Sequence, residues 1–127
     1  MKIIVIDDSQ TTLAILSALC AKVCDCQTVT FTESRSAIEY LGVTPADLVL
    51  VDYSMPGVTG TEFIKRLRAT ARNRHTPVVM VTSSREELIR QRALEVGAVA
   101  VLNKPVDMTA LSQVIRDALV PQASYAE

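Results

Sequence analysis

Four short runs of apolar residues recur along the chain, and polar residues follow each run at once. They cover residues 3–6, 48–51, 78–81 and 99–102. Strands without polar alternation are covered on both faces, which is typical of a parallel sheet between two layers of helices. Residues 27–32 instead alternate polar and apolar side chains, which predicts a half-exposed strand at an edge of the sheet.

Five segments with apolar residues at helical spacing alternate with these strands and begin near residues 9, 34, 60, 84 and 107. Ser9 and Asp107 are predicted N-caps, and Ser84 with Glu87 forms a predicted capping box. The predicted helix ends are marked by Gly42, Gly97 and Pro121.

The strict alternation of five strands with five helices predicts an α/β fold with three layers and a parallel five-stranded sheet. Right-handed crossovers and an edge position for residues 27–32 favour the strand order 2-1-3-4-5. This order places the first and third strands side by side, where the order reverses. The length of 127 residues predicts one domain over residues 1–121, followed by a short polar tail over residues 122–127.

The composition narrows the classes of function. Hydrophobic residues make up 49% of the chain and the formal net charge is −1, so a compact domain is expected. Lysine and arginine form no basic stripe with interleaved aromatic residues, which argues against direct binding of nucleic acid. The first apolar run is too short for a signal peptide, and no segment approaches the length of a membrane span. We therefore expect a soluble cytoplasmic protein.

Cys20, Cys24 and Cys26 are the only cysteines, and they lie close together in the sequence. An odd, clustered set does not suit the disulfide framework of a secreted protein. A zinc site would need a fourth ligand, and the only histidine, His75, is far away in the sequence. We expect Cys20 to pack as a small apolar residue on the first helix, with Cys24 and Cys26 where that helix ends.

Polar residues that carry chemistry follow four of the predicted strands. Asp7 and Asp8 follow the first strand, Asp52 the third, Thr82 the fourth and Lys104 the fifth. The carboxyl ends of parallel strands share one edge of the sheet, where such folds bind their ligands. Three carboxylates close together repel one another, and Mg²⁺ with oxygen ligands is the hard cation that best compensates them.

Asp52, Thr82 and Lys104 together describe a phosphoryl-transfer site. The lysine supplies a positive charge for a phosphate oxygen or for Asp52 itself, and Thr82 offers a hydroxyl donor. Asp52 would then be the nucleophile and form an aspartyl phosphate. Each residue taken alone can have an ordinary structural role, since Asp8 can be an N-cap and Lys104 a surface lysine. Their joint placement at one sheet edge favours the site.

The sequence resembles the receiver domain of two-component response regulators, such as the chemotaxis receiver, over residues 2–119. The resemblance rests on a set of residues in the family's order and spacing: Asp7-Asp8, Asp52, Met55-Pro56-Gly57, Gly60, Thr82, Gly97-Ala98 and Lys104-Pro105. It implies a flavodoxin-like fold. It also implies a signalling switch that accepts a phosphoryl group from a histidine kinase or a histidine phosphotransfer protein.

The resemblance assigns roles in phosphorylation and metal binding. It implies that Asp52 is phosphorylated, and that Asp8, Asp52 and the backbone carbonyl of Ser54 bind Mg²⁺ directly. Asp7 would act mostly through water. Mn²⁺ would be a substitute for Mg²⁺.

The resemblance also implies that Thr82 and Lys104 bind the phosphoryl group, and that the bond before Pro105 is cis. The family usually has an aromatic residue three positions before the lysine, where this chain has Val101. An aromatic switch is therefore absent, while a shift of Thr82 and a movement of the fourth helix are still available. We expect weaker or differently routed coupling to the face of the fifth strand.

Ser54 and Ser84 occupy positions that tune hydrolysis in the family. Both are small and polar, so we expect a phosphate lifetime of minutes rather than days. Leu13 lies where many relatives carry a charged residue, and we expect it to be exposed near the site and to help dock the kinase.

The expected outputs are contacts with a downstream protein or with an output domain outside this sequence. The family also allows homodimerisation through the fourth helix, the fifth strand and the fifth helix. The chain would catalyse only its own phosphorylation and dephosphorylation.

Two alternative functions are less well supported by the sequence. A magnesium-dependent phosphohydrolase would need an acid where Ser54 stands and an inserted cap. A pseudo-receiver that acts only as an interaction module would not need the complete set of acids, threonine and lysine. A dinucleotide-binding domain is excluded because no glycine-rich loop follows the first strand.

Overall fold

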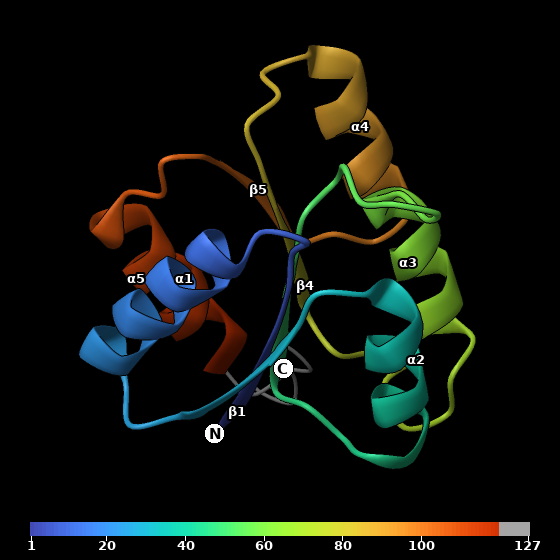
Figure 1. Ribbon diagram of the computed structural model, residues 1–127, viewed down its shortest axis with the longest axis horizontal. Helices are drawn as coiled ribbons and strands as arrows, with labels where there is room; N and C mark the ends of the chain where they lie inside the picture. The colour runs from blue at the N-terminus through green and yellow to red at the C-terminus, as the bar shows by residue number, and fades with distance from the viewer. Residues whose placement is uncertain (120–127) are drawn as a thin grey trace, which may run out of the picture.

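A computed structural model describes residues 1–119, which form a five-stranded parallel sheet with five helices (Figure 1). The strand order is β2-β1-β3-β4-β5, which confirms the predicted fold class and topology. In chain order the elements are β1 (Lys2–Ile6), α1 (Gln10–Val23), β2 (Gln27–Phe31), α2 (Ser34–Val43), β3 (Leu48–Val51), α3 (Gly60–Arg68), β4 (Val78–Thr82), α4 (Glu87–Glu95), β5 (Ala100–Asn103) and α5 (Met108–Leu119). The predicted domain boundary at residue 121, Pro121 as a helix end, and the tail over 122–127 lie outside the described residues.

The helices form two layers, with α1 and α5 on one face of the sheet and α2, α3 and α4 on the other (Figure 1). Successive side chains of a strand point to opposite faces, so each of the central strands contributes to two separate cores. Ile4 and Ile6 pack toward α2, α3 and α4, whereas Ile3 and Val5 pack toward α1 and α5. This arrangement explains the unbroken apolar runs of β1, β3 and β4.

The strand β2 lies at the edge of the sheet, as its alternating sequence predicts. Gln27 and Thr30 are exposed, while the residues between them are half-buried. Among the described residues, no helix has both the length and the apolar character needed to cross a membrane.

Three of the predicted helix signals are confirmed. The Ser9 side chain accepts a hydrogen bond from the backbone N–H of Thr12 at 3.2 Å. The Asp107 carboxylate accepts one from the N–H of Ala110 at 3.0 Å. Gly97 follows the end of α4 with a φ of +112°, a conformation that favours glycine.

Two predicted helix signals are wrong. The fourth helix begins at Glu87, and Ser84 caps nothing in it, because the loop holds this serine away from the helix and its Oγ accepts from the N–H of Glu86. The second helix runs through Gly42 and ends after Val43, since Gly42 has an ordinary helical backbone rather than a positive φ.

Candidate functional site

The pairing of β1 with β3 brings the predicted acids together. Ile6 and Val51 are partners in the register, so Asp7 and Asp52 leave the sheet side by side. The N–H of Asp52 donates to the carbonyl of Ile6 at 3.0 Å, which fixes the backbone at this point. One carboxylate oxygen from each of Asp7, Asp8 and Asp52 lies within 4.8 Å of the others.

The three carboxylates differ in exposure. Asp7 is 1% exposed and Asp52 is 6% exposed, whereas Asp8 is exposed to solvent. Burial, followed by repulsion from the Asp7 charge, raises the pKa of Asp52, and Lys104 only partly opposes this. The negative charge of the three carboxylates is therefore only partly compensated by Lys104.

Lys104 enters the same site from the end of β5. Its Nζ lies 2.7 Å from Oδ2 of Asp7 and 3.6 Å from Oδ2 of Asp52. Asp7 also accepts a hydrogen bond from the N–H of Ser9 at 2.9 Å, which ties this carboxylate to the start of α1. One lysine faces three acids, so the oxygen donors left over suit a small hard cation.

Thr82 ends β4, the strand between β3 and β5, and is buried. Its hydroxyl oxygen accepts a hydrogen bond from the N–H of Ser84 at 3.1 Å, and its carbonyl accepts one from the N–H of Lys104 at 2.9 Å. The bond between Lys104 and Pro105 is cis. Ser54 lies in the loop after β3 and is exposed.

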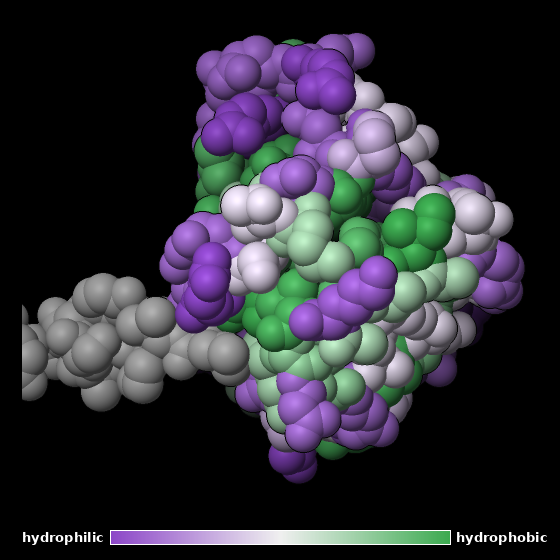
Figure 2. Space-filling model, turned by 90° about the vertical axis from the view of Figure 1, so that its left-hand side faces the viewer, coloured by the Kyte–Doolittle hydropathy of each residue, from purple (hydrophilic) through white to green (hydrophobic). Residues whose placement is uncertain are grey.

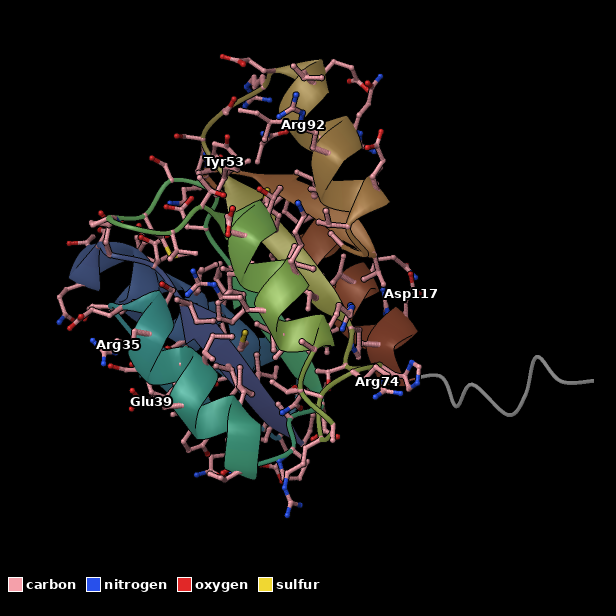
Figure 3. All side chains as sticks on the ribbon, turned by 90° about the vertical axis from the view of Figure 1, so that its right-hand side faces the viewer. Arg35, Glu39, Tyr53, Arg74, Arg92 and Asp117 are labelled. Carbon is pink, nitrogen blue, oxygen red and sulfur yellow. The ribbon has the colours of Figure 1, made fainter. Side chains whose placement is uncertain are left out.

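Gly60 supports the Asp52 backbone at very close range. A Cβ at Gly60 would lie 2.6 Å from the carbonyl oxygen of Asp52 and 3.0 Å from the Cα of Tyr53. The N–H of Gly60 donates to the carbonyl of Tyr53 at 2.8 Å, so α3 begins directly against the site (Figure 3). Only glycine allows this approach without moving the backbone.

Asn103 is a residue of this edge whose role the sequence analysis missed. Its Nδ2 donates to the carbonyl of Ser84 at 2.7 Å and to that of Thr82 at 3.3 Å. The amide thus joins the end of β5 to the loop between β4 and α4. A small hollow beside it is lined by Val101 and Ile89, among other residues. The available signal was the position of Asn103, a polar residue at the end of an apolar strand.

The expectation that Leu13 is exposed is wrong. Leu13 is 3% exposed and packs in the core between α1 and the sheet, together with Leu16 and Cys20. These residues share one helical stripe, which turns Leu13 inward. Figure 2 shows apolar surface on the side that carries α1 and α5, and Ile15 of α1 is 52% exposed.

Comparison with known proteins places the chain in a family. A family model described as the response regulator receiver domain matches residues 3–116. The chain is 32% identical over 84% of its length to the cyclic di-GMP phosphodiesterase response regulator RpfG of Xanthomonas campestris, and covers 28% of that protein. It is 29% identical to the two-component response regulator ARR6 of Arabidopsis thaliana, with 94% of this chain and 69% of the relative covered.

Solved structures agree with this assignment. The chemotaxis response regulator CheY4 of Vibrio cholerae superposes with a TM-score of 0.83 at 26% identity, covering 93% of this chain and 98% of that chain. The receiver domain of sensor histidine kinase PA1611 from Pseudomonas aeruginosa shares the fold, with a TM-score of 0.82, 18% identity and coverage of 91% and 94%. That structure has a magnesium ion coordinated in its active site cleft. The chain described here belongs to the response regulator receiver domain family and is a phosphoacceptor switch of two-component signalling.

Proposed function

We propose that Asp52 is the residue that accepts the phosphoryl group, from a histidine kinase or a histidine phosphotransfer protein. The observation that carries this assignment is a buried carboxylate at a strand end, inside a cluster of three acids and 3.6 Å from the Nζ of Lys104. Its raised pKa is the signature of a carboxylate held in an environment that does not favour the free charge.

Asp7, Asp8 and Asp52 are the side chains that would hold Mg²⁺, with the backbone carbonyl of Ser54 as a further ligand. Their donor set fits, because the oxygens lie within 4.8 Å of one another and carry more negative charge than Lys104 can offset. Mg²⁺ supplies positive charge that neutralises the acids and the oxygens of the incoming phosphoryl group. Mn²⁺ prefers the same oxygen ligands and is the expected substitute.

Asp52 attacks the phosphorus of a phosphohistidine as the nucleophile. The bond between nitrogen and phosphorus breaks, the new bond joins phosphorus to a carboxylate oxygen, and the histidine nitrogen regains a proton. Lys104 can move its ammonium group from the two acids to a phosphoryl oxygen. Thr82 can donate its hydroxyl hydrogen to another, since its oxygen at present only accepts from Ser84.

The phosphorylated state would be read through the loop that follows β4. A shift of Thr82 toward the phosphoryl group moves the carbonyls of Thr82 and Ser84, to which Asn103 is bonded. The nearby helix α4 exposes Leu88 and Leu94, and Val99 is exposed just before β5. These apolar residues support contact with a downstream protein, an output domain or a second copy at this face.

The test is to incubate the protein with acetyl phosphate and Mg²⁺ and to measure the intact mass. The wild type should gain one phosphate, and Asp52→Asn should gain none. Asp117→Asn is a matched control, because Asp117 is an exposed acid on α5 and should leave the reaction unchanged. An unmodified wild type, or a phosphate on Asp52→Asn, would overturn the assignment.

The lifetime of the phosphate follows from the two serines near the site. Ser54 is exposed and Ser84 is half-buried, so neither shields the phosphorus strongly from water. We expect decay within minutes after removal of acetyl phosphate in a buffer with Mg²⁺. A phosphoprotein that persists for days would contradict this expectation.

A further inference from the structure

Three cysteines converge where α1 ends and β2 begins. Cys20 is fully buried on α1, Cys24 is the C-cap residue of that helix, and Cys26 directly precedes β2. The Sγ atoms of Cys24 and Cys26 both contact one acceptor, the carbonyl oxygen of Cys20, at 3.8 and 3.6 Å. Two thiols from the connection between α1 and β2 are therefore held against one point of the helix.

The thiols of Cys24 and Cys26 lie on the same side of the connection, since both contact the carbonyl oxygen of Cys20. Cys24 has an extended backbone, with φ −149° and ψ 163°, and the chain bends at Cys24 and Asp25 before β2 begins. Both side chains are half-buried, so a small reagent can reach them. Burial first, and then a hydrogen bond with the Cys26 side chain, raise the pKa of Cys24 to about 11.

Cys20 takes a different part in this group. Burial raises the pKa of the Cys20 thiol to about 12, so it is almost entirely protonated at neutral pH. Its side chain packs with Leu13 and Leu16 in the core beneath α1. Cys20 therefore supplies the carbonyl that holds the other two thiols, while its own sulfur is inert.

Sharing of a metal ion by the three sulfurs is not supported by their geometry. Within residues 1–119, the acidic cluster at the other end of the sheet is the only group of three or more acidic, cysteine or histidine ligands whose atoms lie within 4.8 Å of one another. The reaction open to the two adjacent thiols of Cys24 and Cys26 is therefore with each other, to form a disulfide.

We infer that Cys24 and Cys26 form a reversible disulfide and constitute a redox-modification site separate from Asp52. The oxidant is a small disulfide such as oxidised glutathione. The Cys26 thiolate attacks one sulfur of the oxidant and releases one glutathione thiolate. The Cys24 thiol then loses its proton, attacks the Cys26 sulfur and releases the second glutathione. Two thiols and one glutathione disulfide give one protein disulfide and two reduced glutathiones.

The site is suited to regulation rather than to permanent stabilisation. A disulfide that closes only a three-residue loop constrains the unfolded chain little, and its short ring stores strain that makes reduction easy. The bond would stiffen the connection between α1 and β2, next to the hydrogen bond from the N–H of Gln27 to the carbonyl of Met1. This connection lies at the opposite end of the sheet from Asp52, so phosphorylation should proceed in both redox forms.

The experiment treats the reduced protein with oxidised glutathione, blocks the remaining thiols with N-ethylmaleimide and measures intact and peptide masses. Wild type and Cys20→Ala should each lose two hydrogens, with the bond mapped to Cys24 and Cys26. Cys24→Ser should accumulate one glutathione on Cys26, because its second thiol is missing. Cys26→Ser should likewise accumulate one glutathione on Cys24 and should not close.

The inference is overturned if wild type retains bound glutathione without closing, or if closure requires Cys20. It is also overturned if only disulfides between two chains form. These outcomes leave the role of Asp52 untouched, because the acetyl phosphate assay is read on a different residue.

Discussion

The two ends of the sheet both bury polar side chains, but they satisfy them in opposite ways. At the carboxyl end, Asp7 and Asp52 are buried beside Asp8 and face a single lysine. At the amino end, Asn73 and Thr76 are buried, and their side chains bond with each other and with backbone groups. At the carboxyl end the acids outnumber the positive charges, whereas at the amino end the buried side chains have their hydrogen-bond partners.

The side-chain amide of Asn73 is fully hydrogen-bonded. Its Oδ1 accepts from the N–H of Ala46 at 3.0 Å and from the hydroxyl of Thr76 at 2.8 Å. Its Nδ2 donates to the carbonyls of Leu41 and Thr44, at the end of α2. All four hydrogen-bonding positions of the amide are filled, so this side chain fastens three segments together.

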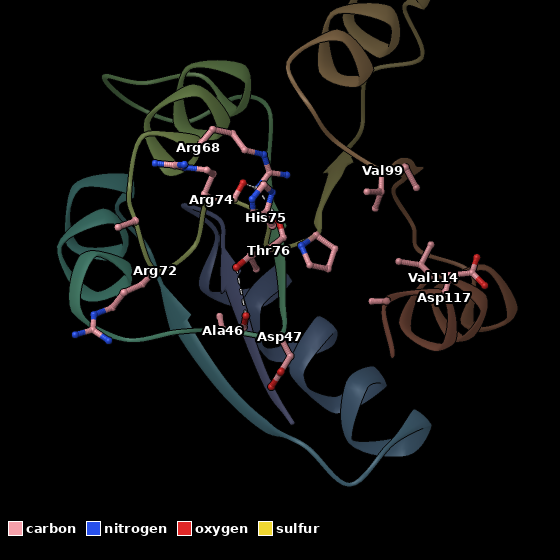
Figure 4. A pocket seen from close by; sticks show the side chains of 14 residues that line it. Ala46, Asp47, Arg68, Arg72, Arg74, His75, Thr76, Val99, Val114 and Asp117 are labelled. Atoms are coloured by element: carbon pink, nitrogen blue, oxygen red, sulfur yellow. Dashed lines mark hydrogen bonds between the residues drawn. The ribbon is translucent and has the colours of Figure 1, made fainter. Parts of the chain in front are cut away.

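Arg68 extends the same network. Its Nη1 donates to the carbonyl of Thr76 at 2.6 Å and its Nη2 to the carbonyl of Gly97 at 3.0 Å. A hollow at this end has a volume of about 560 Å³, and its wall also includes Arg74 and Asp117. Figure 4 shows Arg68 and Thr76 among the side chains that line it. The larger hollow is therefore not at the acidic site. Uncompensated charge distinguishes the functional end better than size does.

The largest expected change in the free energy of unfolding concerns the hydrogen-bond network at the amino end of the sheet. Asn73→Ala leaves the N–H of Ala46 and the carbonyls of Leu41 and Thr44 without their partner, which should cost on the order of 3 kcal/mol of the free energy of unfolding. Urea unfolding measures this. Asn103→Ala is the matched control, since it removes a half-buried amide at the other end. An equal loss in both variants would contradict the contrast between the ends.

A pair of glycines tests how tightly the acidic end is built. Gly60→Ala places a methyl group against the carbonyl of Asp52 and should destabilise the protein by roughly 2 kcal/mol. It should also lower the yield of phosphorylation in the folded protein. Gly42→Ala should stabilise by about 0.5–1 kcal/mol, because Gly42 lies within α2 with nothing near its Cβ position. If Gly60→Ala and Gly42→Ala changed the free energy of unfolding by the same amount and in the same direction, the close approach of Gly60 to Asp52 would not matter for stability.

Neutralising Asp52 should stabilise the protein. In EDTA at neutral pH, Asp52→Asn should raise the free energy of unfolding by on the order of 1 kcal/mol, and so the melting temperature by roughly 4 °C. The reason is that burial and Asp7 raise the pKa of Asp52, so the folded state resists its charged form. A lower melting temperature for Asp52→Asn would show that this charge is well accommodated.

The pH dependence of this gain has a defined sign. The pKa of Asp52 is higher in the folded than in the unfolded state, so the wild type carries its penalty at pH values above the folded pKa. As the pH falls through that value toward about 4, the unfolded value for an aspartate, the folded protein binds the proton and the penalty disappears. The advantage of Asp52→Asn should therefore shrink on acidification. An advantage that grows would contradict the direction of the shift.

The smallest effect concerns communication from the acidic end. Asn103→Ala should cost about 1 kcal/mol or less, because its amide is half-buried. Hydrogen exchange should nevertheless quicken in the loop between β4 and α4, and the change on phosphorylation should weaken there. Val101→Tyr should strengthen the response of α4 by filling the hollow beside Thr82. An unchanged response in both variants would place the coupling elsewhere.

The fold, and the meeting of Asp7, Asp52 and Lys104 at one edge of the sheet, could be predicted from the sequence for a physical reason. Buried parallel strands leave unbroken apolar runs, and their ends mark where Asp7, Asp52 and Lys104 stand. The amino end was harder to predict, because Asn73 lies in a polar segment that reads as an ordinary turn. Its burial depends on the carbonyls of α2, which are distant in sequence.

The failed cap prediction at Ser84 also depended on tertiary contacts, whereas the error at Leu13 did not. Ser84 looks like a cap from its spacing to Glu87, yet Asn103 and Thr82 hold it in the loop. Leu13 looked exposed from its place near the site, although its spacing to Leu16 already indicated the buried stripe.

The location of the phosphate tests the role of Asp52 most directly. Protein phosphorylated with acetyl phosphate and Mg²⁺ is reduced with borohydride, which converts an aspartyl phosphate to homoserine, and the peptides are sequenced by mass spectrometry. We expect the conversion at Asp52, with Asp7 and Asp8 unmodified. Conversion at Asp7 or Asp8, or phosphate found on a serine with Asp52 intact, would contradict it.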